Sequence, residues 1–172
     1  LRLLRSVVPS SVEFALDLDG RIPPVMLDPV QVEQILMNLC INARDAMEGR
    51  GRIVIGLHRT ALPRSVCSSC RQPLEGEFVE LCVTDAGPGI APAHLDRIFE
   101  PFFSTKETGK GSGMGLATIH GILHEAAAHV LVETELGMGS RFRLLFPALE
   151  AVHSEAAGIP APAQGGSARD SL

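Results

Sequence analysis

Polar side chains recur at helical spacing along residues 28–47. Gln34, Asn38, Asn42 and Asp45 are separated by four, four and three residues, so a helix would place them on one face. Amide and carboxylate oxygens are ligands that hard cations accept, and Mg²⁺ takes few of them because it prefers phosphates for the rest. The ridge is therefore a candidate magnesium site, although the same spacing also suits an ordinary solvated helix face.

A second candidate site is an acid followed by glycines, in the segment Val83-Thr-Asp-Ala-Gly-Pro-Gly-Ile90. Asp85 ends an apolar stretch, and Gly87 and Gly89 permit close backbone approach and unusual dihedral angles. A carboxylate at the end of a strand could accept a hydrogen bond from a ligand amino group, such as that of adenine. The alternative is a tight turn with a polar cap.

The third candidate is the glycine-rich segment from Gly109 to Gly115, which leads directly into a helical pattern. Backbone N–H groups of such a loop and the positive end of the helix suit phosphate binding. The segment is not a Walker A loop, because it lacks the closing Gly-Lys-Ser/Thr and no strand precedes it. It is not the glycine fingerprint of a Rossmann dinucleotide-binding fold either, because no parallel strand precedes it. A mobile loop without ligand remains the alternative.

These segments need a scaffold of strands and helices to bring them together. Asp28 and Pro29 are typical of a helix start, and further helices are expected over 91–98 and 116–126. Strands are expected over 12–18, 52–59, 78–84, 129–134 and 140–146, and residues 60–77 form a loop or a long hairpin. The short connection 135–139 is typical of a hairpin. We therefore predict an α/β (α+β) two-layer sandwich: a mixed, mostly antiparallel sheet of about five strands with about three helices on one face.

Composition narrows the function classes. The chain has 172 residues, room for one domain, and a net charge of −5 that argues against a nucleic-acid partner. No apolar run reaches the length of a bilayer crossing and no signal peptide is recognisable, so we expect a cytoplasmic chain without direct membrane contact. Ala, Pro, Gly and Ser dominate residues 156–172, which predicts a disordered tail or linker.

Four cysteines are too few for a disulfide scaffold. Cys67 and Cys70 form a single Cys-x-x-Cys in the segment between two strands, and three interpretations stay open. They are loop thiols without a special role, a disulfide, or half of a zinc site that would need two more ligands such as His58 or a symmetry-related pair. Without a second Cys-x-x-Cys we assign no metal to them.

Taken in order, the motifs resemble the catalytic ATP-binding domain of bacterial sensor histidine kinases, which has the Bergerat (GHKL) fold. The same superfamily includes DNA gyrase, the heat-shock chaperone ATPase and the mismatch-repair ATPase. The resemblance covers residues 28–147. It rests on five segments that look like the family's N, G1, F, G2 and final glycine boxes: Asp28–Met47, Asp85–Ile90, Ile98–Lys106, Gly109–Gly115 and Gly137–Phe142.

The resemblance implies roles for individual residues. Asn42 would bind Mg²⁺, Asn38 would lie beside the phosphates of ATP, and Asp85 would accept a hydrogen bond from the adenine amino group. In the F box, Phe99, Phe102 and Phe103 would anchor the lid or touch a partner helix. The remaining implied nucleotide contacts are Asp45, Gly87, Gly89, Ile90, Lys106, Gly111, Ser112, Gly113, Met114, Gly115, Leu116 and Ser140; for Lys106 an ordinary surface lysine is the alternative.

One position bears on the type of reaction. Hydrolytic members of the superfamily carry Glu one turn before the Mg²⁺ asparagine, and here that position is Asn38. An amide cannot accept the proton of an attacking water, which favours phosphoryl transfer to a positioned nucleophile. The expected function is that of a two-component phosphorelay transferase. The alternatives are a regulatory nucleotide-binding module without transfer, or a hydrolase, which Asn38 disfavours.

The acceptor histidine is expected outside this chain. We divide it into an N-terminal strand and lead-in (1–27) from a dimerisation and histidine-phosphotransfer domain, the ATP-binding core (28–149) and the tail (150–172). The His124-Glu125 pair lies on the helix after the G2 box and is interpreted as structural or as part of the surface. The chain is thus expected to bind ATP but not to autophosphorylate; its partners are that dimerisation domain and a response regulator, whether or not the parent protein is membrane-anchored.

Two departures from the family pattern stand out. Ala86 replaces a frequent asparagine, at little expected cost. Ala126-Ala-Ala128 stands where the family commonly has Gly-Gly. If that turn needs a positive φ, an alanine there is strained by about 1 kcal/mol.

Overall fold

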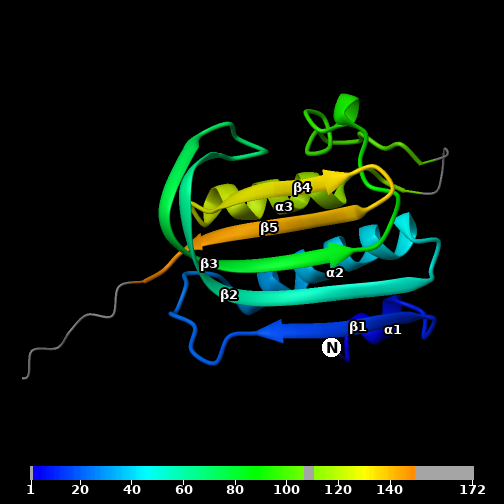
Figure 1. Ribbon diagram of the computed structural model, residues 1–172, viewed down its shortest axis with the longest axis horizontal. Coiled ribbons are helices and arrows are strands. Elements are labelled where there is room, and N and C mark those ends of the chain that lie inside the picture. Colours follow the sequence, from blue (N-terminus) through cyan, green and yellow to red (C-terminus); the bar gives the residue numbers. More distant parts are fainter. Residues whose placement is uncertain (1, 107–110, 150–172) are drawn as a thin grey trace, which may run out of the picture.

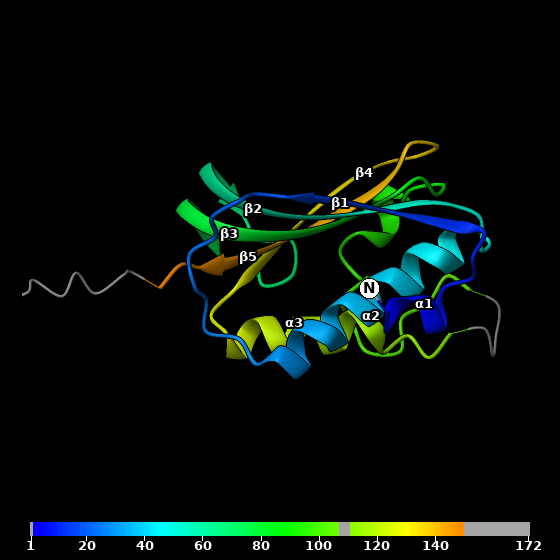
Figure 2. The same cartoon turned by 90° about the horizontal axis from the view of Figure 1, so that it is seen from below.

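A computed structural model describes residues 2–106 and 111–149, which form one sheet with helices on a single face (Figure 2). The elements in chain order are α1 (Leu4–Val7), β1 (Val12–Leu18), α2 (Pro29–Ala46), β2 (Gly51–Val66), β3 (Pro73–Asp85), the 3₁₀ turn η1 (Pro92–His94), α3 (Gly115–Glu125), β4 (His129–Glu135) and β5 (Gly139–Pro147).

The sheet has five strands in the order β1-β2-β3-β5-β4 (Figure 1). β1 pairs with β2 in parallel, and the other three pairs are antiparallel. This arrangement confirms the predicted mixed, mostly antiparallel sheet. β4 and β5 are antiparallel, as expected for strands joined by so short a connection, because parallel strands need a much longer crossover.

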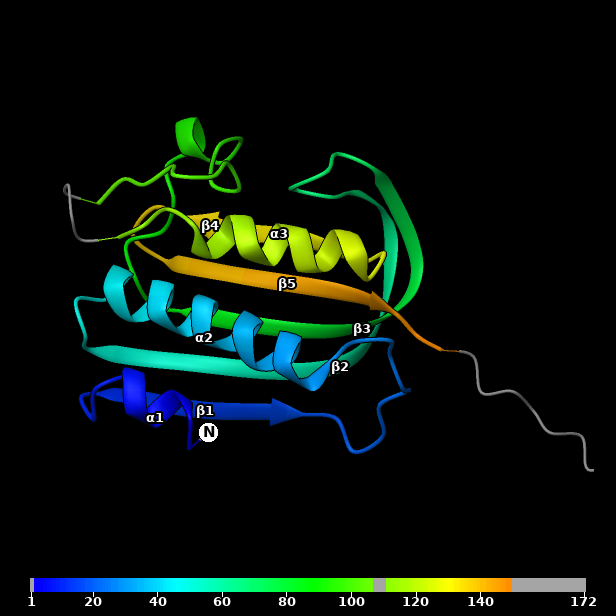
Figure 3. The same cartoon turned by 180° about the vertical axis from the view of Figure 1, so that it is seen from behind.

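The helix layer is formed mainly by α2 and α3, which lie side by side against the sheet (Figure 3). Asp28 begins α2 with a capping box: its side chain accepts from the Val30 N–H, and the Gln31 side chain accepts from the Asp28 N–H. The apolar faces of the two helices fill the core with Ile35, Leu39, Cys40, Ala43, Ile119, Ile122 and Leu123. None of the helices in the described ranges has the length and hydropathy of a bilayer crossing.

The turn after α3 uses a positive φ at an alanine. Ala127 has φ 50°, and the N–H groups of Ala127 and Ala128 donate to the carbonyls of His124 and Leu123. This is the pairing of a Schellman cap, whose left-handed position favours glycine. The structure thus confirms the condition under which an alanine in this turn is strained.

The structure adds to or changes the sequence expectations at three places. Helix α1 was not predicted. The short helix expected over 91–98 is only the 3₁₀ turn Pro92–His94, because the segment continues as irregular turns. Strands β2 and β3 run well beyond the predicted ends, so residues 60–77 form the long hairpin rather than the loop. The predicted tail from 150 onward and positions 107–110 of the glycine-rich segment lie outside the described residues.

The distal half of the β2–β3 hairpin bends away from the sheet plane, and its tip reaches β4 (Figure 1). A register shift between Leu62 and Ser65 marks the irregularity in the ladder. At the tip, the Ser68 N–H donates to the Val130 carbonyl and the Ser68 hydroxyl accepts from the Val132 N–H. The tip therefore covers part of the outer edge of β4, whose pairing strand is β5 on the other side.

Candidate functional site

Asp85 is the buried acid at the C-terminal end of β3. Its exposed fraction is 8%, and it lies opposite Ser140 in the β3–β5 register. The Asp85 Oδ1 accepts a 2.8 Å hydrogen bond from the Gly87 N–H. Burial raises the pKa of Asp85, and the backbone N–H groups of Gly87 and Ser140 oppose that rise. A carboxylate accepts about four hydrogen bonds, so this one has capacity for a further donor.

Two glycines let the chain pack closely around this acid. Gly139 has φ 102°, and a Cβ there would overlap the Asp85 carbonyl oxygen. Gly89 has φ 76°, and a Cβ there would overlap the carbonyl oxygen of Glu135. Both positions need glycine for the left-handed φ and for the close approach of two backbones.

A hydroxyl pair lies beside the acid. The Thr134 Oγ1 is 3.0 Å from the Ser140 Oγ and accepts a 2.9 Å bond from the Ile90 N–H. The Thr134 hydroxyl also donates to the Gly139 carbonyl at 3.0 Å. Ser140 and Ile90, both predicted from the family pattern, are therefore joined through a threonine that sequence reasoning did not single out. The signal for Thr134 was its place opposite Ser140 in the hairpin register.

The second half of α2 is the segment on which the motifs converge. A Cβ on Gly87 would lie 3.1 Å from the Ala46 Cβ, so the turn after Asp85 touches the end of α2. Gly115, at the start of α3, lies against Asn38, with its Cβ position 3.6 Å from the Asn38 Oδ1. The structure therefore brings three predicted motifs to one helix.

Asn38 and Asn42 are half-buried, and neither side chain makes a hydrogen bond to any residue in the described ranges. Their amide oxygens are neutral oxygen donors of the kind that Mg²⁺ accepts. The donor chemistry of this ridge thus fits a magnesium ion that shares its coordination with phosphates.

Asp45, by contrast, is engaged by two cations. Its Oδ2 accepts from the Lys106 Nζ at 2.6 Å, and its Oδ1 is 2.6 Å from the Arg44 Nη2. Burial opposes ionisation, but the Lys106 and Arg44 contacts outweigh it and lower the pKa of Asp45. Lys106 is thus tied to the acid of the ridge rather than projecting freely into solvent.

The F-box phenylalanines have different environments. Phe99 is buried in the core near His120, and Phe103 is half-buried under the Arg97 guanidinium at 4.5 Å. Phe102 is 78% exposed, with φ 66°. Its N–H donates to the Gly113 carbonyl at 3.0 Å, so the loop of the F box touches the described part of the glycine-rich segment.

That segment is described from Gly111 onward. A Cβ on Gly113 would lie 2.6 Å from the Phe102 carbonyl carbon, and φ there is 67°, so this glycine is required. The Ser112 Oγ accepts from the Met114 N–H at 3.3 Å just before α3. Gly111, Met114 and Leu116 lie in the same stretch, which enters the helix whose N-terminus faces the α2 ridge.

The cysteine pair lies elsewhere, at the tip of the β2–β3 hairpin, and all four cysteines are free thiols. His58, considered from the sequence as a further ligand, instead approaches Asp17 and Asp19 at 3.6 and 3.4 Å. The histidine that meets the pair is His129 of β4, 3.6 Å from the Cys70 sulfur. Sequence spacing could not identify it, because 59 residues separate the two.

The Cys67 thiol is fully buried and surrounded by donors. Burial opposes ionisation, but hydrogen bonds from the Cys70 backbone and the Ser69 side chain, with lesser ones from the Val130 and Ser69 backbones, lower the pKa of Cys67 to about 6. Burial raises the pKa of Cys70, and the neighbouring Cys67 adds to that rise. The two thiols therefore differ in their readiness to ionise.

Comparison with protein families matches residues 27–150 to the family described as histidine kinase-, DNA gyrase B- and HSP90-like ATPases. Among curated proteins, the sensor kinase CckA of Brucella abortus is 36% identical over 147 residues, which is 86% of this chain and 16% of that protein. The two-component sensor PprA of Pseudomonas aeruginosa is 39% identical over 117 residues, 68% of this chain and 12% of that protein. The chain thus spans about a sixth of these relatives' length or less.

Solved structures agree in fold. Full-length ShkA in complex with AMPPNP matches with a TM-score of 0.65 and 27% identity, over 87% of this chain and 29% of that one. The nucleotide-free catalytic domain of the histidine kinase ThkA matches with a TM-score of 0.62 and 25% identity, over 86% of this chain and 84% of that one. The likeness to the ThkA domain extends over most of both chains.

Proposed function

We propose that this chain binds ATP with Mg²⁺ and transfers the γ-phosphate to a histidine of a separate dimerisation domain. The chain belongs to the family of histidine kinase-, DNA gyrase B- and HSP90-like ATPases and is a histidine kinase catalytic domain. The observation that carries the proposal is the convergence of a buried acid, an amide ridge and a glycine-rich helix start along the second half of α2.

Adenine is recognised at the sheet end of this region. The Asp85 carboxylate accepts the hydrogen bond of the adenine amino group, in a buried setting where a charge-assisted bond is strong. Thr134 and Ser140 fix the adjacent turn through their hydroxyl contact of 3.0 Å. Gly87 and Gly89 have no side chains, so they allow the backbone to approach the adenine base closely, and Ile90 supplies an apolar contact.

The triphosphate lies between the two helices. Asn42 would hold Mg²⁺ through its side-chain oxygen, and Asn38 would lie beside the phosphates. Asp45 would act on the phosphates indirectly, by holding the Lys106 ammonium group. The ion would neutralise phosphate charge when bound. The backbone N–H groups of residues 111–116 and the N-terminus of α3 supply further donors to the anion.

Asn38 favours transfer over hydrolysis. A carboxylate at this position could take the proton of an attacking water, whereas an amide cannot. Positioning and charge neutralisation are the main requirements of phosphoryl transfer, so a nucleophile delivered by another domain is sufficient.

The partners follow from the same reasoning. The relatives are much longer than this chain, which leaves room for the dimerisation domain that carries the acceptor histidine. Exposed Phe102 and half-buried Phe103 are the proposed contacts with a helix of that domain or with the closed lid. The phosphate then passes to an aspartate of a response regulator, in the cytoplasm. Within the chain we propose the core over 28–149, with 1–27 as lead-in and 150–172 as tail.

The deciding experiment combines binding and transfer. ATP is titrated with and without Mg²⁺, and the chain is then mixed with labelled ATP and the dimerisation domain of its parent protein. We expect Mg²⁺-dependent binding, no label on the chain alone, and phosphohistidine on the added domain. Binding without any transfer would support a regulatory nucleotide module instead. Steady release of free phosphate would support a hydrolase.

A further inference from the structure

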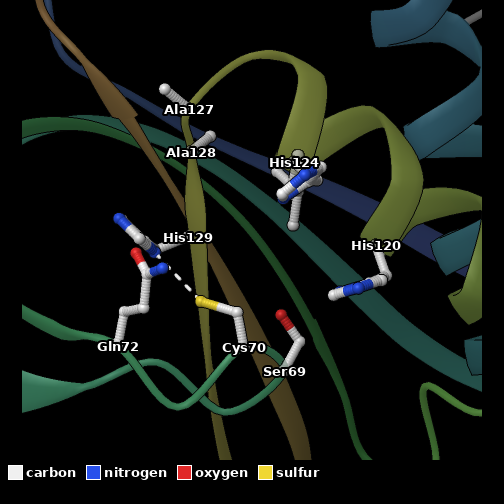
Figure 4. Close-up of a pocket in the computed structure, with 9 residues that line it drawn as sticks. Ser69, Cys70, Gln72, His120, His124, Ala127, Ala128 and His129 are labelled. Carbon is white, nitrogen blue, oxygen red and sulfur yellow. Dashed lines mark hydrogen bonds between the residues drawn. The ribbon is translucent and has the colours of Figure 1, made fainter.

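Cys67 and Cys70 at the hairpin tip and His129 on β4 bring two sulfurs and an imidazole nitrogen together. Figure 4 shows two of these residues, Cys70 and His129. The three ligand atoms all lie within 4.8 Å of one another. We propose that this cluster binds one zinc ion, which fastens the tip of the β2–β3 hairpin to β4. Nothing in the nucleotide site requires such an ion.

The separations suit a tetrahedral zinc site. Zn–S bonds of about 2.3 Å and Zn–N bonds of about 2.0–2.1 Å at a tetrahedral angle put sulfur and nitrogen about 3.6 Å apart. The Cys70 Sγ lies 3.6 Å from the His129 Nδ1. Two thiolates and one imidazole are a set that favours Zn²⁺ over Mg²⁺ or Ca²⁺, which prefer oxygen ligands.

The loop that carries the cysteines is built around the Cys67 sulfur. That side chain is 0% exposed, and its Sγ lies 3.4 Å from the Val130 N–H and 3.5 Å from the Ser69 hydroxyl. Hydrogen bonds of this kind orient a ligand and stabilise its thiolate form. The ligand environment therefore exists before any metal enters.

The turn itself is held in a strained conformation. The Arg71 N–H donates to the Cys67 carbonyl, and the Cys67 N–H donates to the Gln72 carbonyl at 2.9 Å. Arg71 adopts φ 63°, which a non-glycine residue adopts only at a cost. The tight turn brings both thiols of the Cys-x-x-Cys to one side, where a single ion can reach them.

Two of the three proposed ligands, Cys70 and His129, line a cavity that could supply a fourth ligand. The space between the hairpin tip and α3 measures about 270 Å³ and is lined by Cys70, His129, His120 and His124, among others (Figure 4). A site with three protein ligands and one open position takes a water molecule or a group from outside. The cavity is large enough for a water on the ion.

The test measures metal on the purified chain under reducing conditions. After dialysis against metal-free buffer, we expect about one zinc per chain by elemental analysis. Replacement by Co²⁺ should give thiolate-to-cobalt charge-transfer absorption and the intense visible bands of a tetrahedral site. A wild-type chain that retains no metal, and takes up none from added Zn²⁺, would overturn the proposal.

Variants assign the ligands. Cys67→Ser, Cys70→Ser and His129→Ala should each weaken zinc binding by at least roughly tenfold, a loss of the size that removal of a supporting residue already causes. Cys82→Ser and His58→Ala alter a thiol and an imidazole outside the cluster and should bind zinc as wild type does. Equal affinity in all five variants would contradict the assignment.

A thermal measurement keeps the proposal testable if a ligand variant folds poorly. Chelation of the wild-type chain should lower its melting temperature, and added Zn²⁺ should restore it, because a ligand that binds only the folded state stabilises it. Thiol titration provides a further check: two reactive thiols lost to a Cys67–Cys70 disulfide, with no zinc uptake after reduction, would identify a redox pair and overturn the metal site.

Discussion

The two ends of the β2–β3 hairpin carry two different kinds of site. At the sheet end, the turn after Asp85 touches the last residue of α2, the helix whose Asn38 and Asn42 amides have no hydrogen-bond partners among the described residues. At the tip, Cys67 and His129 belong to a cluster whose ligand atoms already lie close together. The first arrangement offers hard oxygen donors, whereas the second offers two sulfurs and an imidazole nitrogen within 4.8 Å of one another.

The two ends of the β2–β3 hairpin are held in place by different interactions. Close backbone packing at the sheet end depends on glycines with positive φ, which allow the turns to approach one another. At the tip, the strands have left the sheet, and the turn is held by bonds to β4 instead. Substitutions at one end should therefore leave the other end intact, and this independence can be tested.

The largest loss of stability is expected for a substitution of Gly139, which packs against the Asp85 backbone. Gly139→Ala would force a Cβ into the Asp85 carbonyl at φ 102°, and strain plus overlap should cost about 2–5 kcal/mol of unfolding free energy. Gly137→Ala is the matched control, because φ there is 83° but nothing lies within 4 Å. It should cost about 1 kcal/mol. Chemical denaturation measures both, and equal losses would contradict the packing argument.

Asp85→Asn should come next. The amide must present its oxygen to the adenine amino group and loses the charge-assisted bond, a loss of about 1.5–3 kcal/mol in ATP binding. Calorimetric titration should show about a 10- to 150-fold weaker affinity. Zinc content should stay as in the wild type, and Cys70→Ser should show the reverse pattern. Unchanged nucleotide affinity in Asp85→Asn would count against the adenine site.

A pH titration of nucleotide binding sharpens the same comparison. Burial raises the pKa of Asp85 from its ordinary 3.8, so the carboxylate is protonated at a higher pH than an exposed aspartate. The charge-assisted bond is present above the folded-state pKa and is lost as the pH falls through it. ATP affinity should decline over that range in wild type. Asp85→Asn controls for titration of the phosphates and should lack the additional decline.

Protonation of Asp85 should also affect folding, in the opposite direction. Because the folded state holds this proton more tightly than the unfolded state, the contribution of Asp85 to the unfolding free energy increases as the pH falls. Asp45 behaves in the other sense, since Lys106 and Arg44 lower its pKa and its contribution is lost at acidic pH. The unfolding free energy measured against pH, in wild type and in Asp85→Asn, separates the contribution of Asp85 from that of Asp45.

The smallest expected effect lies beside the tip cavity. Ala127→Gly should stabilise the chain by about 1 kcal/mol, because glycine adopts the φ of 50° at the cap of α3 without strain. Ala126→Gly is the control: its φ of −84° is ordinary, so glycine there should not stabilise. Thermal or denaturant unfolding measures both. A stabilisation of equal size at both positions would disagree with the cap geometry.

The sequence predicted most of the fold through local signals. Asp28 and Pro29 indicated the start of α2 correctly, because a cap is made within one turn of chain. The sequence placed strands within all five of the observed ones, and the short connection before Gly139 indicated the antiparallel pairing. The strand ends at Val66 and Pro73 were missed, because polar and proline-containing segments there are extended only through pairing with each other.

For the candidate site, residue types and their order indicated the family, and they made Asp85, Asn38 and Asn42 candidate site residues, since each motif is contiguous in the chain. Tertiary structure alone decided which side chains meet across long separations: Thr134 beside Ile90, Lys106 on Asp45, and His129 at the Cys67–Cys70 turn. Such contacts depend on strand register and on the bend of the hairpin. These follow from how the whole chain packs, and no local spacing encodes them.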